Sequence, residues 1–284
     1  MRKRSLLGVF LLILLCGGAW MAYTQGPPAQ PLTIDKLRDD LYVIIGDGGN
    51  VPVYLTDEGL IISDDKYERD NVEILAKIKT VSNLPVKYVL NTHSHGDHTG
   101  GNVKMFSTAE ILSHRNAREN MVTQKLPGAP RITFNDEASV TLGGKEVRAK
   151  YFGRGHTNGD AVIYYSAARV IHTGDLFLSA PNAAPFIDYS SGASALEWTG
   201  TIDRILQSDW SYDVVVPGHG PVVKKADLAD FRDRLRKMRD RVGAMVQDGR
   251  SKDDIAKTLV SDFNWGPKGG GMLQLDSFIA EMKR

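Results

Sequence analysis

The segment 41–64 alternates short β-branched stretches with turn residues. It reads LYVIIGDGGNVPVYLTDEGLIISD, and Gly-Asp-Gly-Gly-Asn and Asp-Glu-Gly separate its three strand-like parts, which predicts a β-meander. Apolar residues then recur at helical spacing over 71–80, and residues 85–90 again have the composition of a strand. A strand, a helix and a strand that ends in a polar loop is how α/β folds present active-site residues.

The second half of the chain repeats this pattern. Strand-like stretches are predicted at 140–142, 146–152, 161–166, 170–172 and 213–216, with a helix around 195–207. Two successive β-rich blocks, each followed by helices, predict an α/β fold in which two sheets pack face to face with helices outside.

The C-terminal part is predicted to be helical. From Asp227 a long charged helix carries an apolar stripe with steps of three and four residues: Leu228, Phe231, Leu235, Met238, Val242 and Met245. The stripe is expected to pack on the core, and a homodimer interface is the alternative. Residues 262–268 and the run Gly269–Gly271 predict a loop before a short amphipathic end.

Charge and cysteine content exclude some classes of protein. Lys plus Arg number 35 and Asp plus Glu 34, a net charge of +1, so no positive excess is available to neutralise a nucleic-acid backbone. A small-molecule substrate is the expected partner. Cys16 is the only cysteine, which excludes an internal disulfide.

The N-terminus has the pattern of an export signal. Basic residues at 2–4 precede an apolar run at 6–15 and the small residues at 17–19. We expect residues 1–25 to be a signal peptide, 26–32 a Pro-rich spacer and 33–284 the folded domain with a C-terminal helical extension. The protein would then be periplasmic or secreted. In the alternative, the N-terminal segment stays uncleaved as a membrane anchor, since its apolar stretch continues to Ala22.

The segment 91–101, Asn-Thr-His-Ser-His-Gly-Asp-His-Thr-Gly-Gly, follows a predicted strand directly. In an extended backbone, residues i and i+2 face the same side, so His93 and His95 would offer imidazole nitrogens to one ion. Gly96 would permit a sharp turn, beyond which Asp97 and His98 supply ligands to a second ion. Packing does not explain three His and one Asp within six residues, because such groups are costly to bury without partners.

Three more candidate ligands stand at predicted strand ends. His156, Asp175 and His219 each have neighbouring Gly residues, which let a ligand approach the backbone closely. With the first cluster they supply six or seven ligands, the number that two metal ions need.

These motifs, in this order, resemble those of the metallo-β-lactamase superfamily from about Leu41 to Pro221. The resemblance implies a four-layer αββα fold with two mixed sheets. It assigns a first metal to His93, His95 and His156, a second metal to Asp97, His98 and His219, and a bridging role to Asp175. Asp64, after an early strand, would orient the His-rich loop by accepting hydrogen bonds.

The resemblance implies a hydrolase with two Zn²⁺ per chain. A hydroxide shared by the metals would attack an ester, thioester, lactone or lactam, and Asp97 would hold the water and move its proton. Lys224, Phe186 and Tyr189 are the predicted substrate contacts, with Lys224 receiving a substrate carboxylate.

Three alternatives stay open at this point. The first is a β-lactamase proper, although those enzymes usually have Cys or Ser where this chain has Asp175; Asp there is similar to glyoxalase II, whose following segment the chain matches poorly. The second is an oxidoreductase of the persulfide-dioxygenase type with one iron, against which His98 and His219 argue. The third is a scaffold without activity, against which the intact ligand set argues.

The two remaining histidines match no ligand position. His114 follows a predicted strand at 111–113 and is expected to have a structural or surface role. His172, three residues before Asp175, is expected to face away from the site, where its polar neighbours decide its protonation.

Overall fold

A computed structural model describes residues 31–179, 184–265 and 274–284. Residues Leu32–Arg284 form one compact unit. The predicted signal peptide, residues 26–30 of the spacer and the run Gly269–Gly271 lie outside the described residues. Within the described ranges, no helix combines the length and apolar character needed to cross a bilayer.

The first sheet has its strands in sequence order. They are β1 (Thr33–Lys36), β2 (Leu41–Ile45), β3 (Val51–Thr56), β4 (Gly59–Ser63), β5 (Val86–Asn91), β6 (Glu110–His114) and β7 (Ile132–Phe134). The pairs from β1 to β4 are antiparallel, which is the predicted meander extended by one strand at its edge. The pairs from β4 to β7 are parallel, so the carboxyl ends of β4 and β5 lie at the same edge.

The second sheet has the order β13-β12-β11-β10-β9-β8. Its strands are β8 (Glu137–Leu142), β9 (Lys145–Tyr151), β10 (Ala161–Tyr165), β11 (Val170–His172), β12 (Val214–Val216) and β13 (Val223–Lys224). Only β11 and β12 run parallel among these pairs. The loops after β11 and β12 therefore leave the sheet at the same edge.

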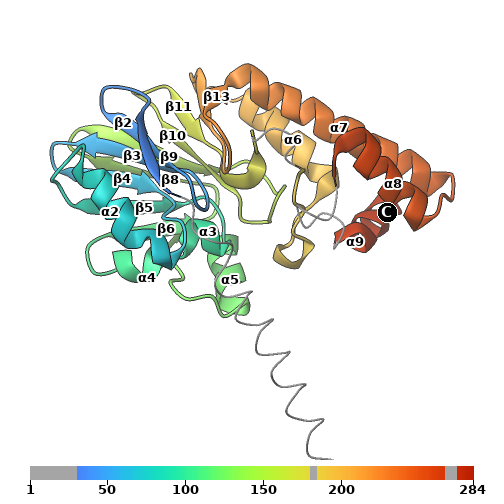
Figure 1. Cartoon of the computed structure of the whole chain (residues 1–284), viewed down its shortest axis with the longest axis horizontal. Coiled ribbons are helices and arrows are strands. Elements are labelled where there is room, and N and C mark those ends of the chain that lie inside the picture. Colours follow the sequence, from blue (N-terminus) through green and yellow to red (C-terminus); the bar gives the residue numbers. More distant parts are fainter. Residues whose placement is uncertain (1–30, 180–183, 266–273) are drawn as a thin grey trace, which may run out of the picture. The chain divides into compact units, whose positions relative to one another are not determined.

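Helices connect and cover the sheets. The α-helices are α2 (Asn71–Lys79), α3 (Gly96–Thr99), α4 (Asn102–Met105), α5 (Arg115–Thr123), α6 (Ala195–Leu206), α7 (Lys225–Gln247), α8 (Lys252–Phe263) and α9 (Leu275–Met282), and the 3₁₀ turns are η1 (Glu68–Asp70), η2 (Gly174–Leu176) and η3 (Tyr189–Ser191). In Figure 1, α2 and α4 lie by the first sheet, and α6 and α7 lie by the second.

Alternation along the strands divides the apolar residues into three layers. In β10, Ile163 and Tyr165 pack against first-sheet residues such as Tyr54 and Leu90, so one core fills the space between the sheets. The intervening Tyr164 belongs to a second core with α6 to α9, and a third core lies between the first sheet and α2 and α4. The predicted four-layer αββα fold is confirmed.

The C-terminal region agrees with the prediction in part. All six residues of the α7 stripe are buried in the core under the second sheet, as the core-packing interpretation expected. The predicted loop at 262–268 is wrong at its start, because residues 262 and 263 belong to α8. That helix buries Ile255 and Leu259 and ends at Asn264 in the left-handed conformation, which Asn tolerates as a helix cap.

Candidate metal centre

The His-rich loop leaves the first sheet where β5 ends at Asn91. Residues 92–94 form bends, and α3 begins at Gly96 with the carbonyl of His95 accepting from the backbone N–H groups of His98 and Thr99, both at 3.0 Å. The premise that His93 and His95 share a face of an extended strand is therefore wrong. Their rings meet because the loop folds back, with centroids 4.8 Å apart.

The turn at Gly96 does not depend on glycine. Its φ lies outside the left-handed region, and a Cβ added there would have no heavy atom within 4 Å. The chain turns here as predicted, but it does not need glycine to do so, because the turn is the first turn of a short helix, which any residue can adopt.

Four side chains form a first group of candidate ligands. One ligand atom from each of His93, His95, His156 and Asp175 lies within 4.8 Å of the others. The Nε2 atom of His93 is buried without a hydrogen-bond partner, although buried polar atoms in folded proteins are nearly always bonded. This atom has the environment of a metal ligand.

The tautomers of the other two imidazoles follow from their hydrogen bonds. His156 donates from Nδ1 to the carbonyl of Phe186 at 2.7 Å, and His95 donates from Nε2 to the carboxylate of Asp188 at 2.9 Å. In its neutral form, each imidazole therefore directs a lone pair inward, and Nε2 of His156 lies 3.0 Å from Nδ1 of His95. Two facing lone pairs repel each other, and a cation between them would turn the repulsion into binding.

A second group consists of Asp97, His98 and His219. His98 bonds through Nδ1 to Asp64 at 2.7 Å, which directs its Nε2 toward Nε2 of His219 at 3.4 Å. Oδ2 of Asp97 lies 3.1 Å from Nε2 of His219 and 3.8 Å from Nε2 of His98. Imidazole nitrogens with one carboxylate are ligands that Zn²⁺ and other borderline metals accept.

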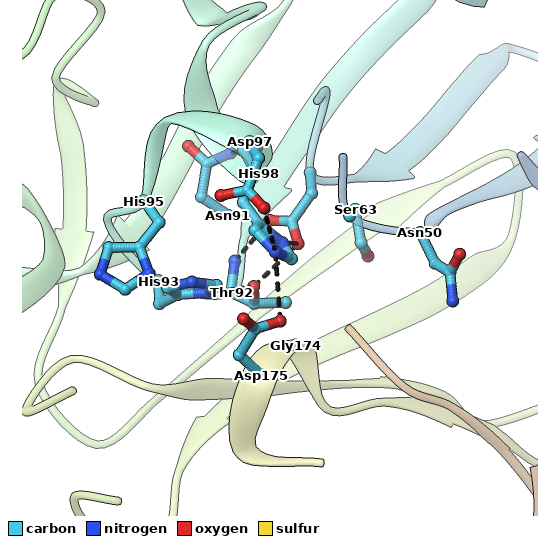
Figure 2. Close-up of polar contacts among 12 residues, drawn as sticks. Asn50, Ser63, Asn91, Thr92, His93, His95, Asp97, His98, Gly174 and Asp175 are labelled. Atoms are coloured by element: carbon cyan, nitrogen blue, oxygen red, sulfur yellow. Dashed lines mark hydrogen bonds and ion pairs between the residues drawn. The ribbon is translucent and has the colours of Figure 1, made fainter. Parts of the chain in front are cut away.

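Asp175, in η2 after β11, has one carboxylate oxygen near each group. Its Oδ2 lies 3.6 Å from Nε2 of His156 in the first group. Its Oδ1 lies 3.2 Å from Nε2 of His98 and 3.5 Å from Nε2 of His219 in the second. Figure 2 shows this carboxylate facing the His-rich loop from the opposite side of the site. The geometry is that expected of a bridging ligand.

Burial and nearby carboxylates set the protonation of these imidazoles. Burial lowers the pKa of His93 well below its usual value and that of His156 to about 4, which favours the neutral form that binds metals. Burial is also the largest single effect on His98 and His219, but the carboxylates of Asp175 and Asp97 together outweigh it and raise both pKa values, that of His219 to about 10. A cation bound there would displace those protons.

Asp64 lies behind the His-rich loop and is fully buried. Its carboxylate accepts from the backbone N–H and hydroxyl of Thr92, at 2.7 and 2.8 Å, and from Nδ1 of His98 at 2.7 Å. Through these bonds Asp64 fixes both the path of the loop and the ring of His98, and it belongs to neither ligand group.

Asp188, which the sequence analysis did not connect to any metal ligand, lies against His95 in the structure. Burial would raise the pKa of its carboxyl, but hydrogen bonds from His95 and Ser190 lower it below the usual value. The carboxylate therefore stays charged and holds Nε2–H of His95. No spacing in the sequence points to this pair, because the two residues are 93 positions apart.

The predicted substrate contacts lie in three different environments. The ring of Phe186 lies 5.9 Å from that of His95 and 5.8 Å from that of His156, so it forms an apolar wall of the first group. Tyr189 donates its hydroxyl to Glu281 at 2.6 Å. Lys224 is exposed at the start of α7, so only Phe186 of the three is placed beside a ligand by these contacts.

His172 is buried at the end of β11 and belongs to neither ligand group. Its Nε2 lies 4.0 Å from Oδ2 of Asp64, the oxygen that accepts from the hydroxyl of Thr92 and from Nδ1 of His98. Burial lowers its pKa to about 4, so this ring is neutral near pH 7.

His114 has a structural environment. Its ring stacks on Tyr151 at 4.2 Å, Nε2 bonds the carbonyl of Asn135 at 2.7 Å, and Nδ1 caps α5 by accepting from Asn116 N–H. We expect His114→Ala to lower the free energy of unfolding by about 1–2 kcal/mol, the usual cost of losing a helix cap, with metal content unchanged. Thermal unfolding and metal analysis of the variant check this, and loss of bound metal would contradict it.

Residues 42–240 match the family model described as "Metallo-beta-lactamase superfamily". The chain belongs to this superfamily. Among curated relatives, it is 27% identical over 167 residues to "Metallo-beta-lactamase IND-1" of Chryseobacterium indologenes, covering 58% of this chain and 69% of that protein. It is 26% identical over 224 residues to "Metallo-beta-lactamase type 2" of Bacteroides fragilis, covering 75% and 89%.

Solved structures of metallo-beta-lactamases have the same fold as this superfamily member. A metallo-beta-lactamase from Pontibacter korlensis superposes with a TM-score of 0.67 at 22% identity, covering 72% of this chain and 99% of that one. DIM-1 metallo-beta-lactamase superposes with a TM-score of 0.64 at 20% identity, covering 73% and 99%. At identities of 22 and 20%, this similarity shows a common fold and does not show a common activity.

Proposed function

We propose that this chain is a hydrolase that holds two Zn²⁺ ions and cleaves a carbonyl-type substrate, an ester, thioester, lactone or lactam. The observation that supports this most strongly is the arrangement of seven side chains in two groups with the carboxylate of Asp175 between them. A cation bound among His93, His95 and His156 would explain why their imidazole nitrogens gather around one point and why Nε2 of His93 is buried without a hydrogen-bond partner.

The ligand set fits zinc better than a hard cation. Five imidazoles and two carboxylates suit a borderline metal, whereas Ca²⁺ and Mg²⁺ prefer oxygen ligands. His93, His95 and His156 would hold one ion, Asp97, His98 and His219 the other, and Asp175 both. When bound, such a pair lowers the pKa of water toward 7 and polarises a carbonyl oxygen.

The chain's own residues define where substrate approaches. The side chains of His219, Asp97 and His95 are 34, 21 and 20% exposed, while those of His93, His98 and His156 are at most 1% exposed. Substrate therefore reaches the site from the open side, past Phe186. Asp97 is the exposed carboxylate on that side, and it would accept and return a proton during hydrolysis.

A β-lactam is the second candidate substrate, favoured by the names of the relatives. The chain has Asp175 where β-lactamases of this superfamily usually have Cys or Ser, so we rank lactams below esters, thioesters and lactones. An oxidoreductase with one iron is disfavoured because it needs no second-metal ligands, and His98 and His219 are both in place.

The test combines metal analysis with a hydrolysis screen. Purified protein should contain two zinc ions per chain, and the zinc-loaded protein should hydrolyse at least one member of a panel of lactams, lactones, esters and thioesters. Chelation should abolish this activity, and restored zinc should recover it. One iron per chain, or zinc-loaded protein inert toward the whole panel, would contradict the proposal.

Export of the chain stays a prediction from its N-terminal pattern. We expect cell fractionation to find the folded domain outside the cytoplasm, in the periplasm or the medium, with residues 1–25 removed. A full-length cytosolic product would contradict it. Full-length protein in the membrane fraction would support the uncleaved anchor instead.

A further inference from the structure

The carboxylate of Glu281, three residues before the last residue Arg284, is buried at a junction with the segment 188–195. It is 8% exposed. Its oxygens accept from the hydroxyl of Tyr189 at 2.6 Å, from the hydroxyl of Ser194 at 2.5 Å and from the backbone N–H of Ala195 at 3.0 Å. One side chain of α9 thus fixes both ends of this segment.

Each end of the segment is connected to a ligand of the first group. At its start, Asp188 holds Nε2–H of His95 and donates its own backbone N–H to the carbonyl of His156, at 3.0 Å. At its end, the backbone N–H of Ser194 bonds the carbonyl of Gly155, directly before His156, at 3.1 Å. Displacing the segment would therefore move His95 and His156 together.

The second group is held by other parts of the chain. Asp64 bonds His98. The side chain of Asn50 bonds the carbonyls of Pro217 and Gly220, at 3.0 and 2.9 Å, on either side of His219. These supports lie before β3 and after β4, far in sequence from α9.

We propose that Glu281 is a positioning residue that sets the affinity of the first metal site, formed by His93, His95 and His156, without acting on the second. This inference rests on the proposed function, since it requires two bound metals. It assigns α9 a role in metal binding, although none of its residues belongs to either ligand group.

The mechanism is restriction of ligand motion. Removing the carboxylate leaves two hydroxyls and one N–H without their acceptor in a buried junction, which favours movement of the segment toward water. Loss of an outer-shell partner usually costs 10–100-fold in metal affinity. Glu281 does not touch the ligands itself and acts on them through the segment 188–195, which includes Asp188. We therefore expect its removal to weaken metal affinity about tenfold, at the lower end of that range.

The experiment measures zinc affinity by competition with a chromophoric chelator. His95→Ala and His219→Ala identify which dissociation constant belongs to which site in the wild-type protein. Glu281→Ala should weaken the first site about tenfold and leave the second unchanged. Glu281→Gln, which keeps the shape of the side chain but only one acceptor oxygen, should restore only part of the affinity, whereas a role in packing alone would predict full recovery.

Asp276→Ala is the matched control, because Asp276 lies on the same helix and pairs only with Lys252 at the exposed surface among its described contacts. It should change neither site. If Glu281→Ala does not fold, Tyr189→Phe removes one of the same hydrogen bonds and should weaken the first site alone. Unchanged constants in a folded Glu281 or Tyr189 variant, or equal weakening of both sites, would overturn the inference.

The outcome also separates this inference from the proposed function. A wild-type chain that binds fewer than two zinc ions would contradict the proposed function and this inference with it. Two zinc ions in the wild-type chain, with no site-selective loss in the variants, would contradict the role of Glu281 alone.

Discussion

Asp175→Ala is expected to abolish hydrolysis and remove metal from both sites. Oδ2 of this carboxylate lies 3.6 Å from Nε2 of His156 in the first group, and Oδ1 lies 3.2 Å from Nε2 of His98 in the second. Removing this one side chain would therefore take a ligand from both metal sites. Loss of an outer-shell partner alone lowers activity or metal affinity 10–100-fold; we therefore expect removal of this ligand to lower kcat/KM by more than about 100-fold. Metal analysis and steady-state kinetics on one preparation measure this.

The control for Asp175→Ala is Asp213→Ala. Asp213 has a side chain 57% exposed that pairs with Arg38 at the surface, and exposed pairs contribute little to stability. Its removal should change neither metal content nor kcat/KM. Retention of both metals by a folded Asp175→Ala chain would disprove the bridging role.

Gly218→Ala is expected to have the second-largest effect. A Cβ at this position would lie 1.9 Å from Oδ1 of Asp175 and 2.7 Å from the backbone carbon of Gly174, whose carbonyl accepts from the backbone N–H of Gly218 itself at 2.8 Å. Relief requires moving the turn that carries His219 away from Asp175. We expect at least about 3 kcal/mol of lost stability, at the upper end of the usual overpacking cost, and loss of second-site metal.

Gly96→Ala provides the matched comparison, since a Cβ there meets nothing within 4 Å. It introduces the same methyl group one residue before Asp97, and it should leave stability, metal content and activity near wild-type values. Chemical denaturation and metal analysis of both variants test the pair. A Gly218→Ala chain as stable and as metal-rich as Gly96→Ala would show that the close approach to Asp175 is not real.

Much of the metal centre could be predicted from the sequence because its ligands form an unusually dense cluster of polar residues along the chain. His93, His95, Asp97 and His98 occur within six residues, and polar groups that are costly to bury rarely gather so closely without a function. The motif order then supplied His156, Asp175 and His219, which the fold brings to the same groups. The two β-rich blocks likewise predicted two sheets, since strand and helix periodicities are local properties of the chain.

What the sequence could not predict depends on contacts between distant segments. Asp188 meets His95 across 93 positions and Glu281 meets Ser194 across 87, and single carboxylates of this kind have no local signature. The conformation of the His-rich loop was also missed, because the bends at 92–94 and the short helix α3 have no local sequence pattern that distinguishes them from an extended stretch. Helix α8 escaped prediction for another reason: its few buried apolar residues, Ile255 and Leu259, give a weak pattern.

Anomalous diffraction at the zinc edge, from crystals of the purified chain, tests the central claim most directly. The account predicts two peaks, one among His93, His95 and His156 and the other among Asp97, His98 and His219, with Asp175 contacting both. A single peak, or peaks away from these side chains, would contradict it.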